Sequence, residues 1–310
     1  MVSVVIPTYN VAPYIKRCID SVLSQSYHDI EIVVVDDASI DHSADIAELY
    51  RQQHHGIRII KHDKNKGLMT TRRDGYMAAS GSFIMFLDAD DALPPDAVQT
   101  LVERQEQTHA DMVMGDLLKI YVSGRTERRI GSLHSTVSSS AVLEALIDNR
   151  IIHSLCGKLF KATLLREEGL LSFDDVTIAE DACLLYQLAD RAQVVASVSA
   201  MVYHYYENKA SSSLHTYGMR EIESSIKAYR TIAHVCQPYT LLRERLGRRL
   251  TQAVFALYLE PVPIGQVRAL LRKYDMERYG SARYARRYLG ATDCWFFVKR
   301  FVYARTKKKR

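Results

Sequence analysis

The sequence predicts an α/β protein with a parallel sheet, and two observations support this fold class. Apolar segments of strand type alternate with amphipathic segments of helix type through the first third of the 310-residue chain. That order produces parallel strands joined by crossover helices. Hydrophobic residues make up 47% of the chain and charged residues 25%, as in an ordinary globular protein. The length favours one large domain with a smaller attachment.

The elements of the first third can be placed from their apolar residues. The expected strands are Val2–Ile6, Ile30–Val35, Ile57–Lys61 and Ser82–Leu87, and the expected helices are Tyr14–Gln25, Ser43–Gln53 and Met69–Ser80. The first helix has apolar residues at Ile15, Cys18, Ile19 and Val22, which is the spacing of one helix face. Residues 96–220 are expected to form further helices and short strands, and residues 221–310 are expected to be almost wholly helical.

The distribution of charge and the cysteine content indicate which kinds of partner and which cellular compartment to expect. Residues 220–310 contain 21 Lys and Arg against 7 Asp and Glu, a net charge of +14, whereas residues 1–219 carry −9. The two parts are therefore expected to face different partners. The five cysteines include no CxxC pair, so neither a disulfide framework nor a zinc site is expected. A strand begins at residue 2 and no apolar run reaches spanning length, which predicts a cytoplasmic protein.

Polar residues follow three of the expected strands, at the point where each strand ends. These segments are Pro7–Asn10, Asp36–Ser39 and Asp88–Asp91. The carboxyl ends of parallel strands meet at one edge of a sheet, and ligands bind beyond that edge. Five carboxylates gathered there would raise one another's pKa unless a cation or hydrogen-bond donors compensate for their charge. A binding site accounts for this arrangement.

Asp88 and Asp90 indicate a metal site within this edge. Residues two apart on an extended chain project to the same side. Carboxylate oxygens suit Mg²⁺ or Mn²⁺, which fill their remaining positions with phosphate and water. The segment therefore predicts a metal-diphosphate site. The structural alternative is an acidic turn that caps the next helix, before Pro94 and Pro95.

Other residues at the edge suit a nucleotide. A carboxylate at Asp36 or Asp37 can accept the imide N–H of uracil, and the ring of Tyr9 can lie against the base. Arg72 or Arg73, on the helix after the Asn–Lys–Gly turn, can bind a phosphate through two parallel hydrogen bonds. The alternatives are a helix cap at the aspartates and solvated side chains at the arginines.

At this point the chain resembles a known family. The segments VSVVIPTYN, IVVVDDAS, NKG with TTRRDGYMAASG, and FIMFLDADD are similar, in order and spacing, to the family-2 inverting glycosyltransferases of GT-A fold. The resemblance is specific over residues 2–100. It extends through GKLFKATLLREEGL, the Phe173 and Asp174 pair, AED (179–181) and YHYYENKASSS (203–213), and is there similar to bacterial members that make polysaccharide or lipooligosaccharide.

The resemblance implies a domain plan. Residues 1–115 would be the nucleotide-sugar-binding half of a GT-A domain, with a Rossmann-like sheet. Residues 116–220 would be the acceptor-binding half that carries the catalytic base. Residues 221–310 would form a helical, basic C-terminal region, for which the resemblance gives no role.

The resemblance also implies roles for individual residues. The base and ribose would be held by Thr8, Tyr9, Asp36 and Asp37, the phosphates by Arg72 or Arg73, and the metal by Asp88, Asp90 and Asp91. Asp90 or Asp91 would be the direct metal ligand. Arg72 occupies the arginine position of the family's ARNxG segment, and Arg73 replaces the asparagine. This replacement leaves open which arginine contacts the nucleotide.

Asp181 matches the acidic residue that the family uses as general base. Inversion by a single displacement needs a base for the acceptor hydroxyl and an electrophile for the departing diphosphate. One carboxylate and one metal therefore suffice. Glu180 is the alternative base, and both residues could instead cap their helix.

The histidines allow two interpretations. His204 and His215 flank the segment where related enzymes have a loop over the donor phosphates, so either could contact metal or phosphate. A structural role is the alternative for both. His54, His55 and His62 are expected at the surface.

The C-terminal segment 294–310 combines aromatic and basic residues. Trp295, Phe296 and Phe297 precede seven Lys and Arg between residues 299 and 310. This pattern is typical of a peripheral contact with an anionic membrane, where a lipid-linked acceptor would reside. A terminal helix packed in the core is the alternative. Nucleic acid is not expected, because no recognition motif accompanies the charge.

The sequence as a whole favours an inverting glycosyltransferase. Its donor would be a nucleotide-sugar, with a UDP-sugar preferred, its cofactor Mn²⁺ or Mg²⁺, and its acceptor a glycan or lipid-linked hydroxyl. The alternative is a catalytically inactive sugar-nucleotide-binding or scaffolding subunit. A nucleotidyltransferase would need a glycine-rich basic loop, and a dehydrogenase a GxGxxG segment, after the first strand. The sequence has neither.

Overall fold

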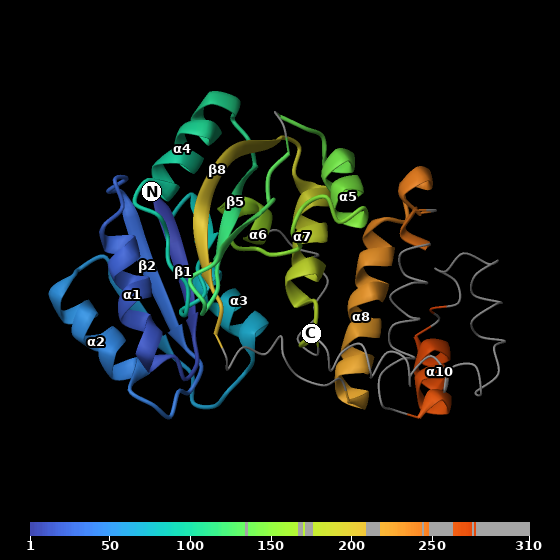
Figure 1. Ribbon diagram of the computed structural model, residues 1–310, viewed down its shortest axis with the longest axis horizontal. Helices are drawn as coiled ribbons and strands as arrows, with labels where there is room; N and C mark the ends of the chain where they lie inside the picture. Colours follow the sequence, from blue (N-terminus) through green and yellow to red (C-terminus); the bar gives the residue numbers. More distant parts are fainter. Residues whose placement is uncertain are drawn as a thin grey trace. The chain divides into compact units, whose positions relative to one another are not determined.

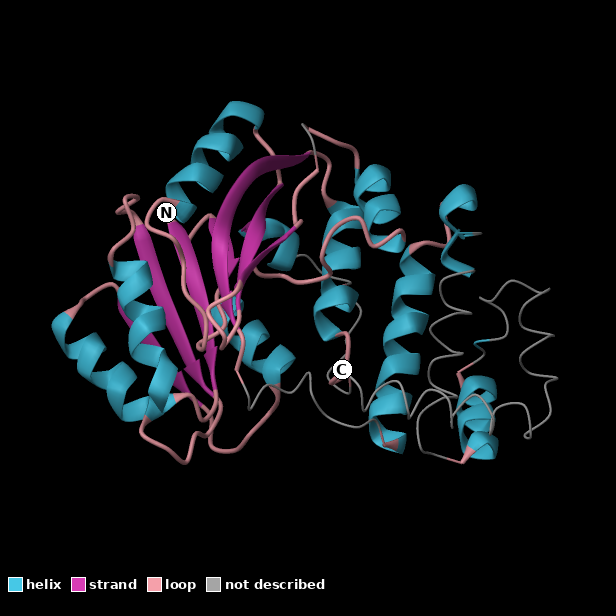
Figure 2. Cartoon of the chain, viewed as in Figure 1, coloured by secondary structure: helices cyan, strands magenta, loops and turns pink. Residues whose placement is uncertain are grey.

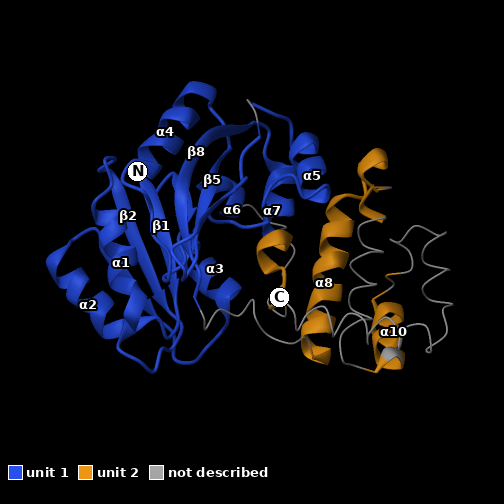
Figure 3. Ribbon diagram, viewed as in Figure 1, with its two compact units in different colours: residues 1–174, 184–211 blue, residues 175–183, 212–310 orange. Residues whose placement is uncertain are grey.

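The computed structural model describes residues 1–133, 136–166, 170, 176–208, 218–243, 245–247, 263–274 and 276. The chain divides into two units, which Figure 3 shows in different colours. Unit 1 contains residues 1–174 and 184–211, and unit 2 contains residues 175–183 and 212–310. The expected boundary at residue 115 falls inside a strand of unit 1. The three-part domain plan stays a prediction.

An eight-stranded mixed sheet forms the centre of unit 1 (Figures 1 and 2). The strands are β1 Val2–Thr8, β2 Ile30–Asp36, β3 Ile57–Lys61, β4 Phe83–Phe86, β5 Met112–Ile120, β6 Thr126–Arg129, β7 Lys158–Lys161 and β8 Val195–Tyr206. Their order is β3-β2-β1-β4-β7-β5-β6, and β8 pairs with β5. The first four strands are mutually parallel, which confirms the fold class predicted from the alternating pattern. The sheet becomes antiparallel where β7 joins β4.

Helices cover both faces of this sheet. In the described part of the chain, the helices include α1 Ala12–Leu23, α2 Ser43–Gln53, α3 Leu68–Ala78, α4 Ala97–Thr108, α5 Ser139–Ile147, α6 Ala162–Arg166, α7 Glu180–Arg191, α8 Met219–Val235 and α10 Ile264–Lys273. The apolar sides of α1, α2 and α4 share one core with alternate residues of β1 and β2, among them Val4 and Val34. The opposite face, which includes Val5 and Val35, packs against α3 at Gly75.

Strand register brings the polar segments to one edge. Thr8, the last residue of β1, pairs with Asp36, the last residue of β2. On the other side of β1, Leu87 continues β4 and donates its N–H to the carbonyl of Val5 (3.0 Å). The residues after β1, β2 and β4 therefore leave the sheet side by side. This is the arrangement that parallel strands predict.

Unit 2 is helical in its described part, as expected for the residues after 220. Gly218 is the N-cap of α8, and its N–H donates to the carboxylate of Glu221 (2.9 Å). Lys273 of α10 pairs with Glu223 of α8 (2.9 Å). In the part of the chain that the structure describes, no helix is long and apolar enough to cross a membrane. The aromatic and basic segment 294–310 lies outside the described residues.

Candidate active site

The loops after β1 and β2 are joined by hydrogen bonds. Asp37 donates its N–H to the carbonyl of Thr8 (2.8 Å). Asn10 donates its N–H to the Ser39 hydroxyl (3.1 Å), and its side-chain oxygen accepts the N–H of Ile40 (2.9 Å). These bonds fix the loop that carries Tyr9. Tyr9 is 47% exposed. A ring so placed is free to contact a planar base.

The turn after Asp37 contains a strained residue. Ala38 has a φ of 59°, a left-handed conformation that costs a residue with a Cβ about 1–2 kcal/mol. The turn brings the N–H of Ser39 to the Asp36 carboxylate (3.3 Å). Strain of this kind concentrates at functional sites, where surrounding contacts hold it in place.

Asp36 supplies an unused acceptor at the sheet edge. Asp36 is only 4% exposed. One carboxylate oxygen accepts from Ser39, whereas the other, Oδ1, is buried and accepts no hydrogen bond from the residues that the structure describes. A buried acceptor without a partner costs about 1–3 kcal/mol. An N–H or O–H group of a ligand would remove that cost.

Asp37 holds the loop that leads into α3. Its Oδ1 accepts the N–H of Lys66 (2.8 Å) and its Oδ2 the N–H of Gly67 (2.9 Å). The imidazole of His62 lies 2.7 Å from the same Oδ1. The expectation of a surface position for His62 is wrong, because its side chain is 3% exposed. Carboxylates on both sides of the ring compensate for its loss of water.

The two arginines of α3 have different surroundings. Arg72 is 1% exposed, and its guanidinium donates to Oδ1 of Asp88 (2.8 Å). Arg73 is 43% exposed, with Nε 3.8 Å from the carboxylate of Asp74. Arg72 therefore extends into the acidic edge while Arg73 lies at the surface. Which of them binds the nucleotide stays a prediction.

The three aspartates of the acidic segment also differ. Asp91 is 1% exposed, and its two oxygens accept the Tyr203 hydroxyl and the Tyr206 N–H (both 2.7 Å). Asp88, beside Arg72, also accepts from the Cys156 thiol (3.5 Å). The carboxylate of Asp90 hydrogen-bonds Asn208. Asp88 and Asp90 are half-buried and keep more room for a ligand than Asp91.

The electrostatics of this segment agree with the repulsion expected from the sequence. Burial, followed by the charge of Asp88, raises the pKa of Asp90. Burial, followed by the charges of Asp88 and Asp90, raises the pKa of Asp91 well above its ordinary value. A bound cation would reduce the repulsion between these carboxylates. Among the described residues, no group of three Asp, Glu, His or Cys side chains could hold a metal by itself, so a metal here would need oxygens from the ligand.

Sequence reasoning missed the contribution of α1 and β8 to this edge. Tyr14 of α1 donates its hydroxyl to Asn208 (3.2 Å). The guanidinium of Arg17 lies 3.6 Å from the ring centre of Tyr206 and donates to the carbonyl of Asp90. The aromatic run from 203 to 206 was the available signal, but only its histidine suggested a function.

His204 lies beside the acidic segment through its backbone. It exchanges backbone hydrogen bonds with Ala92 (2.9 and 3.2 Å). Burial lowers the pKa of its imidazole. A contact of His204 with metal or phosphate stays a prediction, and His215 lies outside the described residues.

The candidate base is carried by the other unit. Glu180 and Asp181 form the first turn of α7, in the part of that helix that belongs to unit 2. A helix N-terminus stabilises negative charge, and both carboxylates are half-buried. Burial, followed by the charges of Glu180 and Asp181, raises the pKa of Cys183 to about 12. The role of base stays a prediction for both residues.

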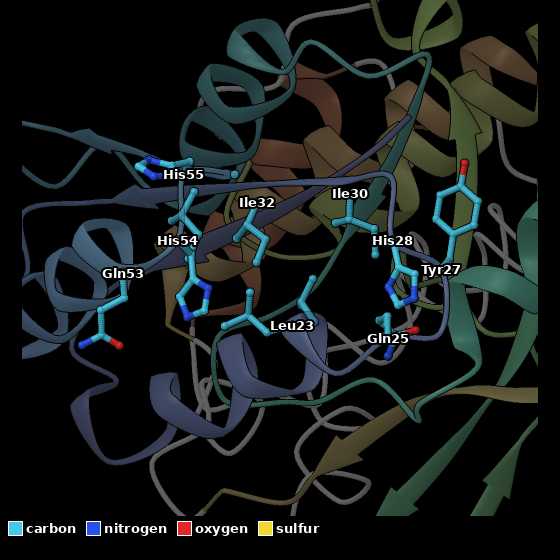
Figure 4. A pocket seen from close by; sticks show the side chains of 12 residues that line it. Leu23, Gln25, Tyr27, His28, Ile30, Ile32, Gln53, His54 and His55 are labelled. Carbon is cyan, nitrogen blue, oxygen red and sulfur yellow. The ribbon is translucent and has the colours of Figure 1, made fainter.

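A pocket lies elsewhere in unit 1, and Figure 4 shows the side chains that line it. Its volume is about 310 Å³. Its lining comes from the end of α1, the loop before β2 and the turn before β3, and includes Leu23, His28 and His54. Ile30 and Ile57 place it at the amino ends of β2 and β3. The pocket is therefore distinct from the acidic edge, which lies at the carboxyl ends.

Comparisons with solved structures identify the fold. The fold matches that of TarS residues 1–349 from S. aureus, solved in complex with UDP-GlcNAc, with a TM-score of 0.74 and 20% identity over 91% of this chain and 82% of that one. It also matches the mannosyltransferase PcManGT from Pyrobaculum calidifontis, solved with GDP-Man and Mn²⁺, with a TM-score of 0.58 and 18% identity over 92% and 77% of the two chains. The fold is therefore that of a GT-A glycosyltransferase.

The family follows from the sequence comparisons. The family described as glycosyl transferase family 2 matches residues 3–168, and the chain belongs to it. The uncharacterized glycosyltransferase EpsJ of Bacillus subtilis is 33% identical over 215 residues. That alignment covers 68% of this chain and 62% of EpsJ, so the chain spans less than two thirds of this relative.

Proposed function

We propose that the protein transfers a sugar from a nucleotide-sugar, preferably a UDP-sugar, to a hydroxyl group of a glycan or lipid-linked acceptor by a single inverting displacement. The observation that carries this proposal is the acidic segment at the carboxyl edge of the sheet. Asp88 and Asp90 lie there half-buried, and the pKa of Asp90 is raised by burial and by its neighbour. A divalent metal with the diphosphate of a donor fits such a site.

The residues of the edge have separate roles in this proposal. The ring of Tyr9 contacts the base, the unused oxygen of Asp36 accepts from the nucleoside, and Oδ2 of Asp37 has a second lone pair for the ribose. Thr8 fixes Asp37 through its carbonyl. Together these residues form the nucleoside part of the site.

The phosphate part of the site is formed by α3 and the acidic segment. Either Arg72, which also donates to Asp88, or Arg73 contacts the phosphate. Asp90 is the preferred direct metal ligand, because both oxygens of Asp91 are already used by β8. A bound Mn²⁺ or Mg²⁺ would stabilise the charge on the departing diphosphate. Asp181, or its neighbour Glu180, would take the proton of the acceptor hydroxyl.

The comparisons support the donor class. TarS residues 1–349 were solved with UDP-GlcNAc and PcManGT with GDP-Man and Mn²⁺. The acceptors at Asp36 and Asp37 suit the imide N–H of uracil, and the donor panel described next decides between UDP and GDP. An inactive sugar-nucleotide-binding subunit would share the donor site, and only turnover separates the two functions.

The test combines donor hydrolysis with UDP binding. The protein is incubated with Mn²⁺ and a panel of UDP-, GDP- and dTDP-sugars, and release of the nucleotide is measured. Asp90→Ala should abolish hydrolysis and weaken UDP binding in Mn²⁺ far more than in EDTA. Asp96→Ala, which removes an exposed carboxylate nearby, is the matched control. Equal UDP affinity of Asp90→Ala and wild type in saturating Mn²⁺ would contradict the metal site, and binding without any turnover would favour the inactive subunit.

A further inference from the structure

A buried imidazole connects two carboxylates beside the proposed nucleoside site. Nδ1 of His62 lies 2.7 Å from Oδ1 of Asp37, and Nε2 lies 3.1 Å from Oδ2 of Asp74. The backbone N–H of His62 donates to the carbonyl of Asp36 (2.9 Å). The ring therefore joins the end of β2 to the middle of α3 with almost no contact with water.

We propose that His62 is a positioning residue for nucleotide binding and that it does this as an imidazolium with both ring nitrogens protonated. A carboxylate only accepts hydrogen bonds, so a carboxylate on each side of the ring requires an N–H at each nitrogen. This inference rests on the proposed function for its effect on the donor. The protonation of the ring does not depend on that function.

The other charged groups around this bridge do not replace it. Nζ of Lys66 and Nε of Arg73 each lie 3.8 Å from the carboxylate of Asp74. Both side chains are more than a third exposed, and exposed pairs at this distance contribute little. They leave His62 as the buried cation between Asp37 and Asp74.

The bridge fixes the segment that carries Arg72. With one oxygen held by His62, Asp37 is oriented to accept the N–H groups of Lys66 and Gly67. Gly67 precedes the first residue of α3 with a φ of 87°, which a residue with a side chain rarely adopts. From this start α3 places Arg72 against Asp88. One protonated ring therefore orders both the nucleoside and the phosphate parts of the site.

The first experiment tests the protonation of His62 without any ligand. In ¹H–¹⁵N spectra of the imidazole rings at pH 7.5, His62 should show two protonated nitrogens. Exposed rings such as His28 and His55 provide the reference signals. His62→Gln identifies the signals by their loss. A neutral His62 ring with a single N–H would overturn the proposal.

The second experiment tests positioning with UDP as the probe. His62→Gln should weaken UDP binding in Mn²⁺ by about 10-fold, the effect of losing a hydrogen bond to a charged group. Turnover at saturating donor should stay within about twofold, because His62 contacts no reacting atom. The expected signature is a raised KM with kcat retained. Wild-type UDP affinity in His62→Gln would overturn the positioning role.

Asp74→Asn keeps the proposal testable if His62→Gln does not fold. Asp74 is 34% exposed, and its replacement removes one acceptor while leaving the ring in place. We expect about threefold weaker UDP binding and a His62 ring that loses its second proton at pH 7.5. If the protonation of the His62 ring and the UDP affinity both equal those of the wild type, the proposed bridge is contradicted.

The matched control is an exposed histidine-aspartate pair. Nδ1 of His42 lies 3.1 Å from Asp45, and the two side chains are 86% and 75% exposed. His42→Gln should leave UDP affinity unchanged, and an equal loss there would overturn the specific role of His62. Absence of UDP binding by the wild type would overturn the UDP donor of the proposed function instead, while the ligand-free spectra would still decide the protonation of His62.

Discussion

Single buried polar atoms determine how the acidic edge is arranged. The hydroxyl of Tyr203 is fully buried, donates to Asp91 (2.7 Å) and accepts the N–H of Asp88 (3.1 Å). Burial, followed by the charge of Asp91, raises the pKa of this phenol well above its ordinary value. The phenol therefore stays protonated as a donor. One hydroxyl sets the path of the chain through the proposed metal ligands.

Replacing Tyr203 with Phe should destabilise the protein by about 1–3 kcal/mol, because two buried groups lose their partner. Urea unfolding would measure the loss. Tyr121→Phe is the matched control, because its hydroxyl bonds Glu127 (2.6 Å) outside the core, where both residues are half-buried, and such a change should stay within about 0.5 kcal/mol. Equal stability of Tyr203→Phe and wild type would show that the two groups find other partners.

Replacing Asp181 with Asn tests the proposed base. A base acts in the chemical step while other residues hold the donor, so turnover should fall by about 10²-fold or more with UDP affinity little changed. Steady-state transfer and UDP binding would be measured together. Glu180→Gln is the paired variant. If Glu180→Gln loses turnover and Asp181→Asn does not, the base is Glu180.

At the scale of elements, the close approach of α3 to the sheet places Arg72. A Cβ added at Gly75 would lie 2.4 Å from Val5 Cγ1 and 3.1 Å from Val35 Cγ2. The helix can therefore approach β1 and β2 only with glycine at this position. Arg72, one turn before Gly75, depends on that depth to contact Asp88.

Gly75→Ala should destabilise the protein by about 1–2 kcal/mol in total, because the added Cβ at 2.4 Å from Val5 places the overpacking cost near the upper end of about 1–3 kcal/mol, above the gain in helix propensity of about 1 kcal/mol. UDP binding should also weaken, because α3 would move outward with Arg72. Urea unfolding and UDP titration measure the two effects. Gly265→Ala in α10 is the control, since no atom of the described residues lies within 4 Å of its added Cβ. A Gly75→Ala protein as stable as wild type would contradict this packing argument.

At the scale of the whole molecule, opposite charges lie in different parts of the chain. The carboxylates of the proposed donor site belong to unit 1, whereas residues 220–310 carry a net charge of +14. Seven of the basic residues lie between 299 and 310. Each contributes about 1 kcal/mol near an anionic membrane. This excess of positive charge supports the hypothesis that the acceptor is presented at a lipid surface.

The full chain should sediment with anionic liposomes at low salt and be released at high salt, because salt screens these charges. Removing residues 299–310 should abolish sedimentation while hydrolysis of a soluble donor persists. Neutral liposomes provide the control. A truncated protein that unfolds would assign the segment to the core, and full-length protein that ignores anionic liposomes at low salt would end the membrane hypothesis.

Local pattern was sufficient to predict the parallel half of the sheet. The strand from Ile57 to Lys61 and the helix from Ser43 to Gln53 have the bounds expected from their apolar spacing. The other expected elements of the first third differ from the observed ones by one to two residues at their ends. Because parallel strands align their carboxyl ends, the sequence alone also predicted that Thr8, Asp36 and Asp88 would meet at one edge.

The tertiary structure decided which polar groups at that edge are free and which are already bound. Spacing along the chain cannot show that Asp91 is held by β8, that Arg72 is buried against Asp88, or that His62 joins Asp37 to Asp74. These partners lie 12 to 112 residues apart in sequence. Their pairing depends on burial and on the register of strands from distant parts of the chain, which only the folded protein defines.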